Sequence, residues 1–232
     1  MKKNGLLAAV VAVIGLSSCG NCQTTNVSLK TDVDSASYAI GVANGAGFRE
    51  NLKTIPGGEA NIDALLAGFI QAIKGDSTKM SQEEAQAYLQ TYFVQASEKE
   101  ANKSKEEGEA FLAENRTKEG VITTESGLQY KVETEGTGEK PTAEATVKVH
   151  YHGTLLDGTV FDSSIERGEP TELSLNQVIR GWTEGLQIMP VGSKYTFWVP
   201  ADLGYGTNVR PGGPIKANDL LKFEIELLEI VK

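Results

Sequence analysis

The spacing of apolar residues changes once along this chain, and that change most constrains the fold. From Ser81 to about Arg116 no proline occurs, and the capping box Ser81-Gln82-Glu83-Glu84 marks a helix start. Apolar residues recur at helical spacing in the first half of this segment, and the stretch 98–109 is mostly charged. After a break at 119–127, apolar and polar residues alternate, which is the period of a strand. We therefore expect a helical first part and a sheet-forming second part.

The segment 81–118 is predicted to be one long connecting helix, on the order of 50 Å at about 1.5 Å per residue. Gly108 is the one strong interruption within it. A disordered charged linker is the alternative interpretation. The capping box and the lack of proline favour the helix.

Two shorter helices are predicted before it. One has Asp34 or Ser35 as its N-cap and ends before Pro56. The other begins at Asn61, carries one apolar face and ends at Gly75. Neither is long enough to be stable alone, so segment 31–80 must pack helix against helix or against a partner chain. We expect it to be an all-α domain.

The last part, 127–232, follows a predicted linker at 119–126 and contains one short helix among several strands. The strands are predicted at 128–132, 147–156, 173–175, 195–199 and 221–227, and the helix within 177–189. Leu228 and Ile230 fall out of phase, which suggests a bulge or a strand end. The fold class is therefore α+β, with a C-terminal antiparallel sheet wrapped around a short helix.

The N-terminus has the pattern of an export signal. Lys2 and Lys3 precede an apolar run from Leu6 to Leu16 that is too short to span a bilayer, and Cys19 follows small residues. This pattern resembles a bacterial lipobox. We expect a lipoprotein signal peptide at 1–18, a lipid on Cys19, a flexible tether at 19–30, and an extracytoplasmic protein anchored to a bacterial membrane. A plain signal peptide is the alternative, and Cys22 forms only a weak CxxC pattern with Cys19.

The overall charge argues against nucleic acid as a partner. The formal net charge of the 232 residues is −9. Without a leader that carries Lys2 and Lys3, 20 basic residues face 31 acidic ones and the charge is −11. Phosphate binding requires concentrated Lys and Arg, which this chain lacks.

Several segments of the second part resemble the FKBP-type peptidyl-prolyl cis-trans isomerases, in order and spacing, over about 126–232. The segments are Val149-His150-Tyr151-His152-Gly153, Asp157-Gly158, Phe161-Asp162-Ser163-Ser164, Val178-Ile179-Arg180-Gly181-Trp182, Leu203-Gly204-Tyr205-Gly206 and the closing strand Phe223-Glu224-Ile225-Glu226-Leu227-Leu228. The first part is similar to the dimeric bacterial subgroup that includes the macrophage infectivity potentiators. That resemblance implies a homodimer through the N-terminal helices.

The resemblance also implies a site that needs no cofactor and no metal. Four residues would be catalytic: Tyr151, Phe161, Asp162 and Tyr205. Six would line the substrate pocket: Leu173, Val178, Ile179, Trp182, Ile215 and Phe223, with Trp182 as its floor. The sequence departs from the family at His152, Leu173 and Lys216-Ala217, and the resemblance implies that Leu173 and Lys216-Ala217 belong to the edge of the pocket. Taken singly, these residues are equally explained by core packing or a turn.

The implied function is peptidyl-prolyl isomerisation in proline-containing client polypeptides outside the cytoplasm. The alternative is a chaperone or binding protein of the same fold with little isomerase activity, and a structural lipoprotein is a minor third. His150 and His152 are expected on the strand face opposite Tyr151, pointing to solvent.

Overall fold

The computed structural model describes residues 27–53, 55–210 and 212–231, which form two compact units. One unit holds residues 27–50 with 61–77, and the other holds 51–60 with 78–231. Cys19, Cys22 and the predicted signal peptide lie outside the described residues. None of the described helices combines the length and the apolarity that a membrane span requires.

The first unit consists of helices α1 (Asp32–Leu52) and α2 (Ile62–Lys74), which touch through the rings of Phe48 and Phe69 at 6.1 Å. At the start of α1, Thr31 Oγ1 accepts from the Asp34 N–H at 3.1 Å, and Asp34 Oδ2 accepts from the Thr31 N–H at 2.9 Å. The cap is thus Thr31, three residues before the predicted Asp34. The predicted ends of α2 are confirmed, because Asn61 caps its start and Gly75 closes it in the left-handed conformation.

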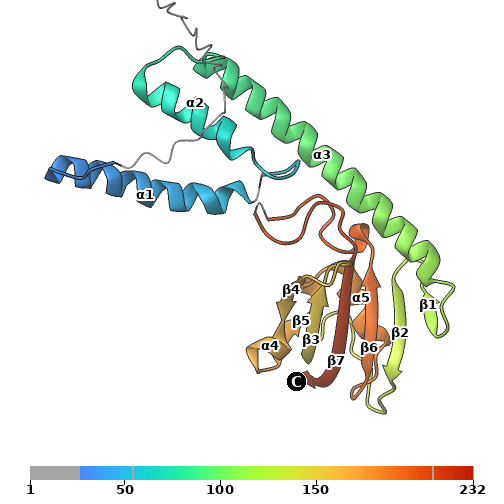
Figure 1. Ribbon diagram of the computed structural model, residues 1–232. Helices are drawn as coiled ribbons and strands as arrows, with labels where there is room; N and C mark the ends of the chain where they lie inside the picture. The colour runs from blue at the N-terminus through green and yellow to red at the C-terminus, as the bar shows by residue number, and fades with distance from the viewer. Residues whose placement is uncertain (1–26, 54, 211, 232) are drawn as a thin grey trace, which may run out of the picture. The chain divides into compact units, whose positions relative to one another are not determined.

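The second unit begins with the long helix α3 (Gln82–Asn115), shown in green in Figure 1. The predicted capping box is present: Ser81 Oγ accepts from the Glu84 N–H at 3.1 Å, and the Glu84 carboxylate accepts from the Ser81 N–H at 2.7 Å. Gly108 does not interrupt the helix. It is buried, and a Cβ there would lie 3.3 Å from Cβ of Leu220, so the glycine permits close packing.

Within the described residues, seven antiparallel strands form the sheet. They are β1 (Val121–Thr123), β2 (Gln129–Thr134), β3 (Thr146–Thr154), β4 (Val160–Ser163), β5 (Thr171–Ser174), β6 (Lys194–Val199) and β7 (Leu221–Val231). Their order is β1-β2-β6-β7-β3-β4, and β5 also pairs with β3. The pairing of β3 with β7 shifts by one residue at Leu228, which confirms the predicted bulge. The short strand β1 lies inside segment 119–126, where we expected only a linker.

Helix α5 (Arg180–Ile188) packs against one face of the sheet and closes the core (Figure 1). Its Trp182 and Leu186 are buried among Phe197, Phe223 and other inward residues of β6 and β7. Burial of large apolar side chains in this layer supplies most of the stabilisation, at roughly 1.5–3 kcal/mol for each fully buried one. The α+β class and the sheet around a short helix are confirmed.

The C-terminal turns of α3 pack on the other face of the sheet. Phe111 contacts Trp198 with ring centroids 6.5 Å apart. The buried Asn115 donates to Gln129 Oε1 at 2.9 Å, and Gln129 Nε2 donates to the carbonyl of Leu112, also at 2.9 Å. Because Gln129 and Trp198 are register partners on β2 and β6, these contacts lie on one patch of the sheet.

Candidate active site

The site is built on the hairpin of β3 and β4, where a tyrosine faces an aspartate. Tyr151 is buried on β3, and its hydroxyl donates to Asp162 Oδ2 at 2.5 Å. Asp162 lies opposite Gly153 in the β3–β4 register. The hairpin turn that brings them together is fixed by Asp157, whose carboxylate accepts from the Thr159 N–H at 2.9 Å.

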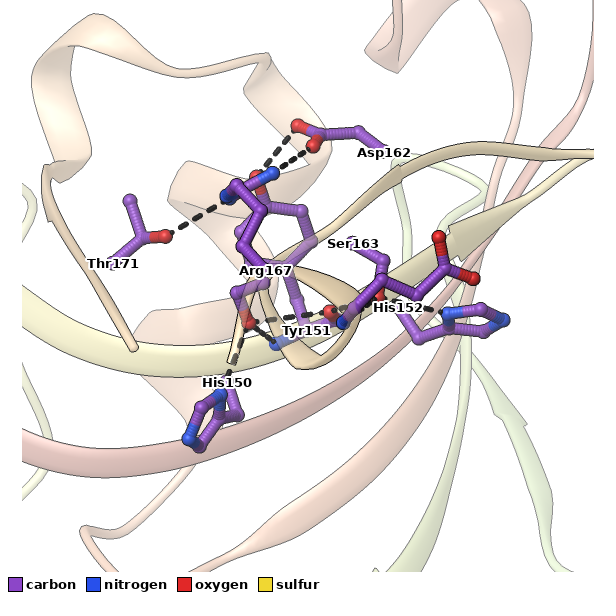
Figure 2. A network of polar contacts seen from close by, with 9 residues as sticks. His150, Tyr151, His152, Asp162, Ser163, Arg167 and Thr171 are labelled. Atoms are coloured by element: carbon purple, nitrogen blue, oxygen red, sulfur yellow. Dashed lines mark hydrogen bonds and ion pairs between the residues drawn. The ribbon is translucent and has the colours of Figure 1, made fainter. Parts of the chain in front are cut away.

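Arg167 completes this polar network, and the sequence pattern did not predict it. It ends the short helix α4 (Ser164–Arg167) and forms an ion pair with Asp162. Its Nη2 donates to the Tyr151 hydroxyl at 2.9 Å and to Thr171 Oγ1 at 3.1 Å. Figure 2 shows Arg167 between Asp162 on one side and Thr171 on the other.

The two serines after Asp162 hold this arrangement in place. Ser163 Oγ accepts from the Glu166 N–H at 3.2 Å and so caps α4. Ser164 Oγ accepts from the backbone N–H of Tyr151 at 2.8 Å, which holds the backbone of Tyr151 against the start of α4. The serines therefore position the aspartate, arginine and tyrosine.

The ionisation of the pair is set by opposing influences. Burial disfavours the charged form of Asp162, but hydrogen bonds from Tyr151 and Arg167, together with the guanidinium charge, lower its pKa below the usual range. Burial and the neighbouring carboxylate raise the pKa of Tyr151. At neutral pH the aspartate is a carboxylate and the tyrosine a neutral donor.

An aromatic cluster lies beside this network. Tyr151 meets Trp182 edge to face at 5.1 Å, Trp182 meets Phe223 at 5.2 Å, and Phe223 meets Phe161 at 5.3 Å. Such edge-to-face pairs contribute about 0.5–1.5 kcal/mol each beyond their buried area. A Cβ at Gly153 would lie 2.7 Å from the Phe161 ring, so only glycine lets that ring lie against Phe223.

Trp182 lies between Tyr151 and Phe223 in the cluster. Its Nε1 is buried and has no hydrogen-bond partner among the described residues.

Tyr205 and Ile179 lie at the border of the cluster. Tyr205 is 44% exposed, and partial burial together with the charge of Asp162 raises the pKa of its hydroxyl. Ile179 is the N-cap of α5, so its own N–H lies outside the hydrogen-bond ladder of that helix. Tyr205 thus offers a neutral donor within the electrostatic influence of Asp162, and Ile179 offers one at the start of the helix that carries Trp182.

The remaining predicted pocket residues are half-buried and pack against the same core. They are Leu173 on β5, Val178 and Ile179 before α5, and Ile215 in the segment before β7. The structure thus joins Tyr151, Phe161, Asp162, Trp182 and Phe223 by direct contacts. Of the other predicted residues, Leu173, Val178, Ile179 and Ile215 pack against the hydrophobic core, whereas Tyr205 is exposed.

The histidines belong to a different surface. His150 and His152 flank the buried Tyr151 on β3 and are half-buried, with Nδ1 atoms 3.1 Å from Ser164 Oγ and Ser163 Oγ (Figure 2). Among the described residues no group of three or more His, Cys, Asp or Glu side chains is placed to hold a metal ion.

Comparison with known proteins decides the family. Residues 137–228 match the family model described as FKBP-type peptidyl-prolyl cis-trans isomerase, and residues 33–132 match the model of the domain amino-terminal to it. The chain is also 42% identical over 240 residues to the FKBP-type peptidyl-prolyl cis-trans isomerase FkpA of Aeromonas hydrophila, a match that covers 100% of this chain and 88% of that protein. This chain belongs to the FKBP-type peptidyl-prolyl cis-trans isomerases.

Other relatives of this FKBP-type isomerase extend the likeness to the whole chain. It is 40% identical over 229 residues to the outer membrane protein MIP of Legionella longbeachae, covering 95% of this chain and 96% of that one. The crystal structure of FkpA from Escherichia coli matches with a TM-score of 0.69 at 35% identity, over 88% of this chain and 98% of that chain. The chain is an enzyme with peptidyl-prolyl cis-trans isomerase function.

Proposed function

We propose that isomerisation takes place over the aromatic cluster, with the proline ring against Trp182, Phe161 and Phe223. The observation that carries this proposal is the unbroken series of edge-to-face rings next to an ionised, clamped Asp162. The substrates are X-Pro bonds of unfolded, proline-containing client polypeptides.

The chemistry needs shape and a few hydrogen bonds. The planar amide resists rotation with a barrier of about 18–20 kcal/mol. In the twisted transition state its carbonyl is less polar, so a site that replaces water by aromatic walls favours the twisted form over the planar one. An acceleration of about 10⁴-fold requires only about 5.5 kcal/mol.

The polar residues have distinct roles in this proposal. The hydroxyl of Tyr205 and the N–H of Ile179 donate to the carbonyls that flank the proline. Asp162 orients Tyr151 and stands near the carbonyl that rotates. Arg167 keeps the carboxylate in place and balances its charge, because it contacts both Asp162 and Tyr151. Leu173, Val178 and Ile215 form the remaining walls.

A protease-coupled assay on a prolyl tetrapeptide tests this site in the purified protein. Phe161→Ala removes a wall and is expected to lower kcat/KM by about tenfold or more. Asp162→Ala is expected to lower it as well, because Tyr151 loses its acceptor. The matched control is Phe69→Ala, which removes a phenylalanine from α2 in the other unit and should leave kcat/KM unchanged. Wild-type activity in Phe161→Ala would refute the site.

We further propose that the protein is a homodimer through its N-terminal helices. The support is the uncovered apolar surface of α1 and α2, on which Val33 is 73% and Ile73 70% exposed. Exposed apolar side chains in such numbers are typical of interaction surfaces.

Membrane attachment through Cys19 is proposed from the sequence pattern at 16–19 and from the name of the outer membrane relative. Cys19→Ala is expected to move the protein from the membrane pellet to the soluble fraction. Cys22→Ala, three residues further on, is the matched control and should stay with the membrane. Membrane retention of Cys19→Ala would contradict the lipid anchor.

A further inference from the structure

The edge of the proposed site is formed by residues 212–219, here called the rim loop. It carries Ile215, which packs against the hydrophobic core that also contains Trp182 and Phe223. The backbone N–H of Asn218 donates to the carbonyl of Gly206 at 2.8 Å, directly after Tyr205. The loop therefore carries Ile215 and is hydrogen-bonded to the residue after Tyr205, and the proposed function assigns both of these residues to the substrate.

The rim loop has an internal frame centred on Asp219. The Lys216 N–H donates to Asp219 Oδ2 at 2.7 Å, and the Asp219 N–H donates back to the Lys216 carbonyl at 3.2 Å. Between them Asn218 has a φ of 64°, the only positive φ of a non-glycine residue in the described parts of the chain. A left-handed residue of this kind persists only where its surroundings hold it.

Helix α3 supplies those surroundings. Glu100 forms an ion pair with Lys216, and Ser104 Oγ donates to Asp219 Oδ1 at 2.6 Å. The side chain of Asn218 donates to the carbonyl of Ala101 at 3.3 Å. The hydrogen bond and charge of Glu100 raise the pKa of Lys216.

The helix residues in these contacts share one face. Glu100, Ser104 and Gly108 are spaced by four, so they follow one another along α3. Gly108 continues the row by letting Leu220, directly after the rim loop, pack against the helix backbone. Three successive turns of α3 thus contact one short segment of the isomerase fold.

We propose that α3 positions the rim of the prolyl site, with Glu100 and Ser104 as positioning residues that act on Ile215 and Tyr205 through the rim loop. This inference rests on the proposed site. The helix is then part of the catalytic unit, because it holds the rim loop at the edge of the substrate site. That loop lies more than a hundred residues after Glu100 in the chain. Neither residue touches the substrate.

Charge reversal in the full-length protein tests the coupling. Glu100→Lys and Lys216→Glu, each alone, are expected to lower kcat/KM on an uncharged prolyl tetrapeptide by about two- to fivefold, the range for a partly exposed ion pair. The loss should fall on KM, because the rim holds the substrate while the aromatic floor is intact. The double variant Glu100→Lys/Lys216→Glu restores the pair and should regain most of the activity.

Two further measurements separate positioning from general stability. Ser104→Ala removes the hydrogen bond to Asp219 without a charge change. The decrease in kcat/KM that it causes should therefore persist when Lys216→Glu is added. Amide hydrogen exchange in residues 212–219 should quicken in Glu100→Lys, while exchange in β3 stays as in the wild type. A purely structural effect would quicken both.

Glu107→Lys is the matched control. It reverses the same charge on the same helix and breaks the exposed pair of Glu107 with Lys103, whose atoms lie 3.6 Å apart. Its kcat/KM should equal the wild-type value.

Normal activity in both single variants, or a double variant no better than either, would overturn the proposal. If Phe161→Ala is also fully active, the proposed site itself is wrong; if Phe161→Ala is impaired while Glu100→Lys is normal, only the role of α3 is refuted.

Discussion

At Asp162, three influences act on one carboxylate. Burial opposes its charge, while the Tyr151 hydroxyl and the Arg167 guanidinium favour it and outweigh burial. The resemblance to the family suggested Tyr151 and Asp162 as site residues, and the β3–β4 hairpin accounts for the contact between them. Arg167 could not be predicted, because its reach depends on α4, a helix of four residues that is too short to give a periodic pattern.

The lowered pKa of Asp162 leads to a prediction about acid stability. A depressed folded-state pKa contributes stability above the unfolded value of about 3.9, and this contribution is lost as pH falls through the folded value. The free energy of unfolding should therefore differ between wild type and Asp162→Asn at pH 7, and the difference should shrink below about pH 4. The effect is modest because the carboxylate is 48% exposed.

Urea unfolding at several pH values measures this difference. In Arg167→Gln the carboxylate remains but loses its cationic partner, so the folded-state pKa of Asp162 should rise toward the unfolded value. The loss of stability in acid should then be smaller than in the wild type and complete at a higher pH. A wild-type to Asp162→Asn difference that stays constant from pH 7 to pH 3 would show that the pair contributes nothing to the pH dependence of stability.

At the scale of elements, local hydrogen bonding decided what the sequence could predict. Asn61 and Ser81 begin helices where the sequence places them, because a cap depends on residues three positions apart. The start of α1 was misplaced, since Asp34 returns a hydrogen bond to Thr31 and does not itself act as the cap. β1 was missed because its three residues gain a structure only by pairing with β2.

Contacts between distant elements were beyond the sequence pattern. The sequence predicts that Gly108 weakens the helix, whereas in the structure the missing side chain lets Leu220 pack closely against α3. In the sequence Lys216 only differs from the family pattern at the edge of the pocket. Its partner Glu100 lies 116 residues earlier, so the sequence pattern did not indicate the ion pair. The aromatic residues of the proposed site came from the resemblance to the family, which rests on the joint order of its motifs. Their edge-to-face geometry, and the need for glycine at position 153, required the fold.

For the whole molecule, the proposed homodimer gives a prediction about mass. Sedimentation equilibrium at micromolar concentration should give twice the chain mass. Ile73→Lys places a charge on the exposed apolar surface of α2 and should shift the protein toward monomer. A lysine near a helix C-terminus suits the helix dipole, so α2 itself should persist.

Two controls accompany this measurement. Lys74→Ala, at the neighbouring position on α2, should remain dimeric. Isomerase activity of Ile73→Lys on a short peptide should be normal, because the proposed site lies in the other unit. A wild-type protein that sediments as a monomer would contradict the dimer.

The contacts of Phe111, Asn115 and Gln129 attach α3 to the sheet and also fix the rotation of the helix about its own axis. A helix turns by about 100° per residue, so the direction in which Tyr88 and Leu89 point is fixed relative to the prolyl site by the number of residues between them. One inserted residue would rotate those side chains by more than a right angle, whereas an insertion of seven would nearly restore them. The number of residues in α3 therefore fixes the rotational orientation of its N-terminal side chains as well as their distance from the sheet.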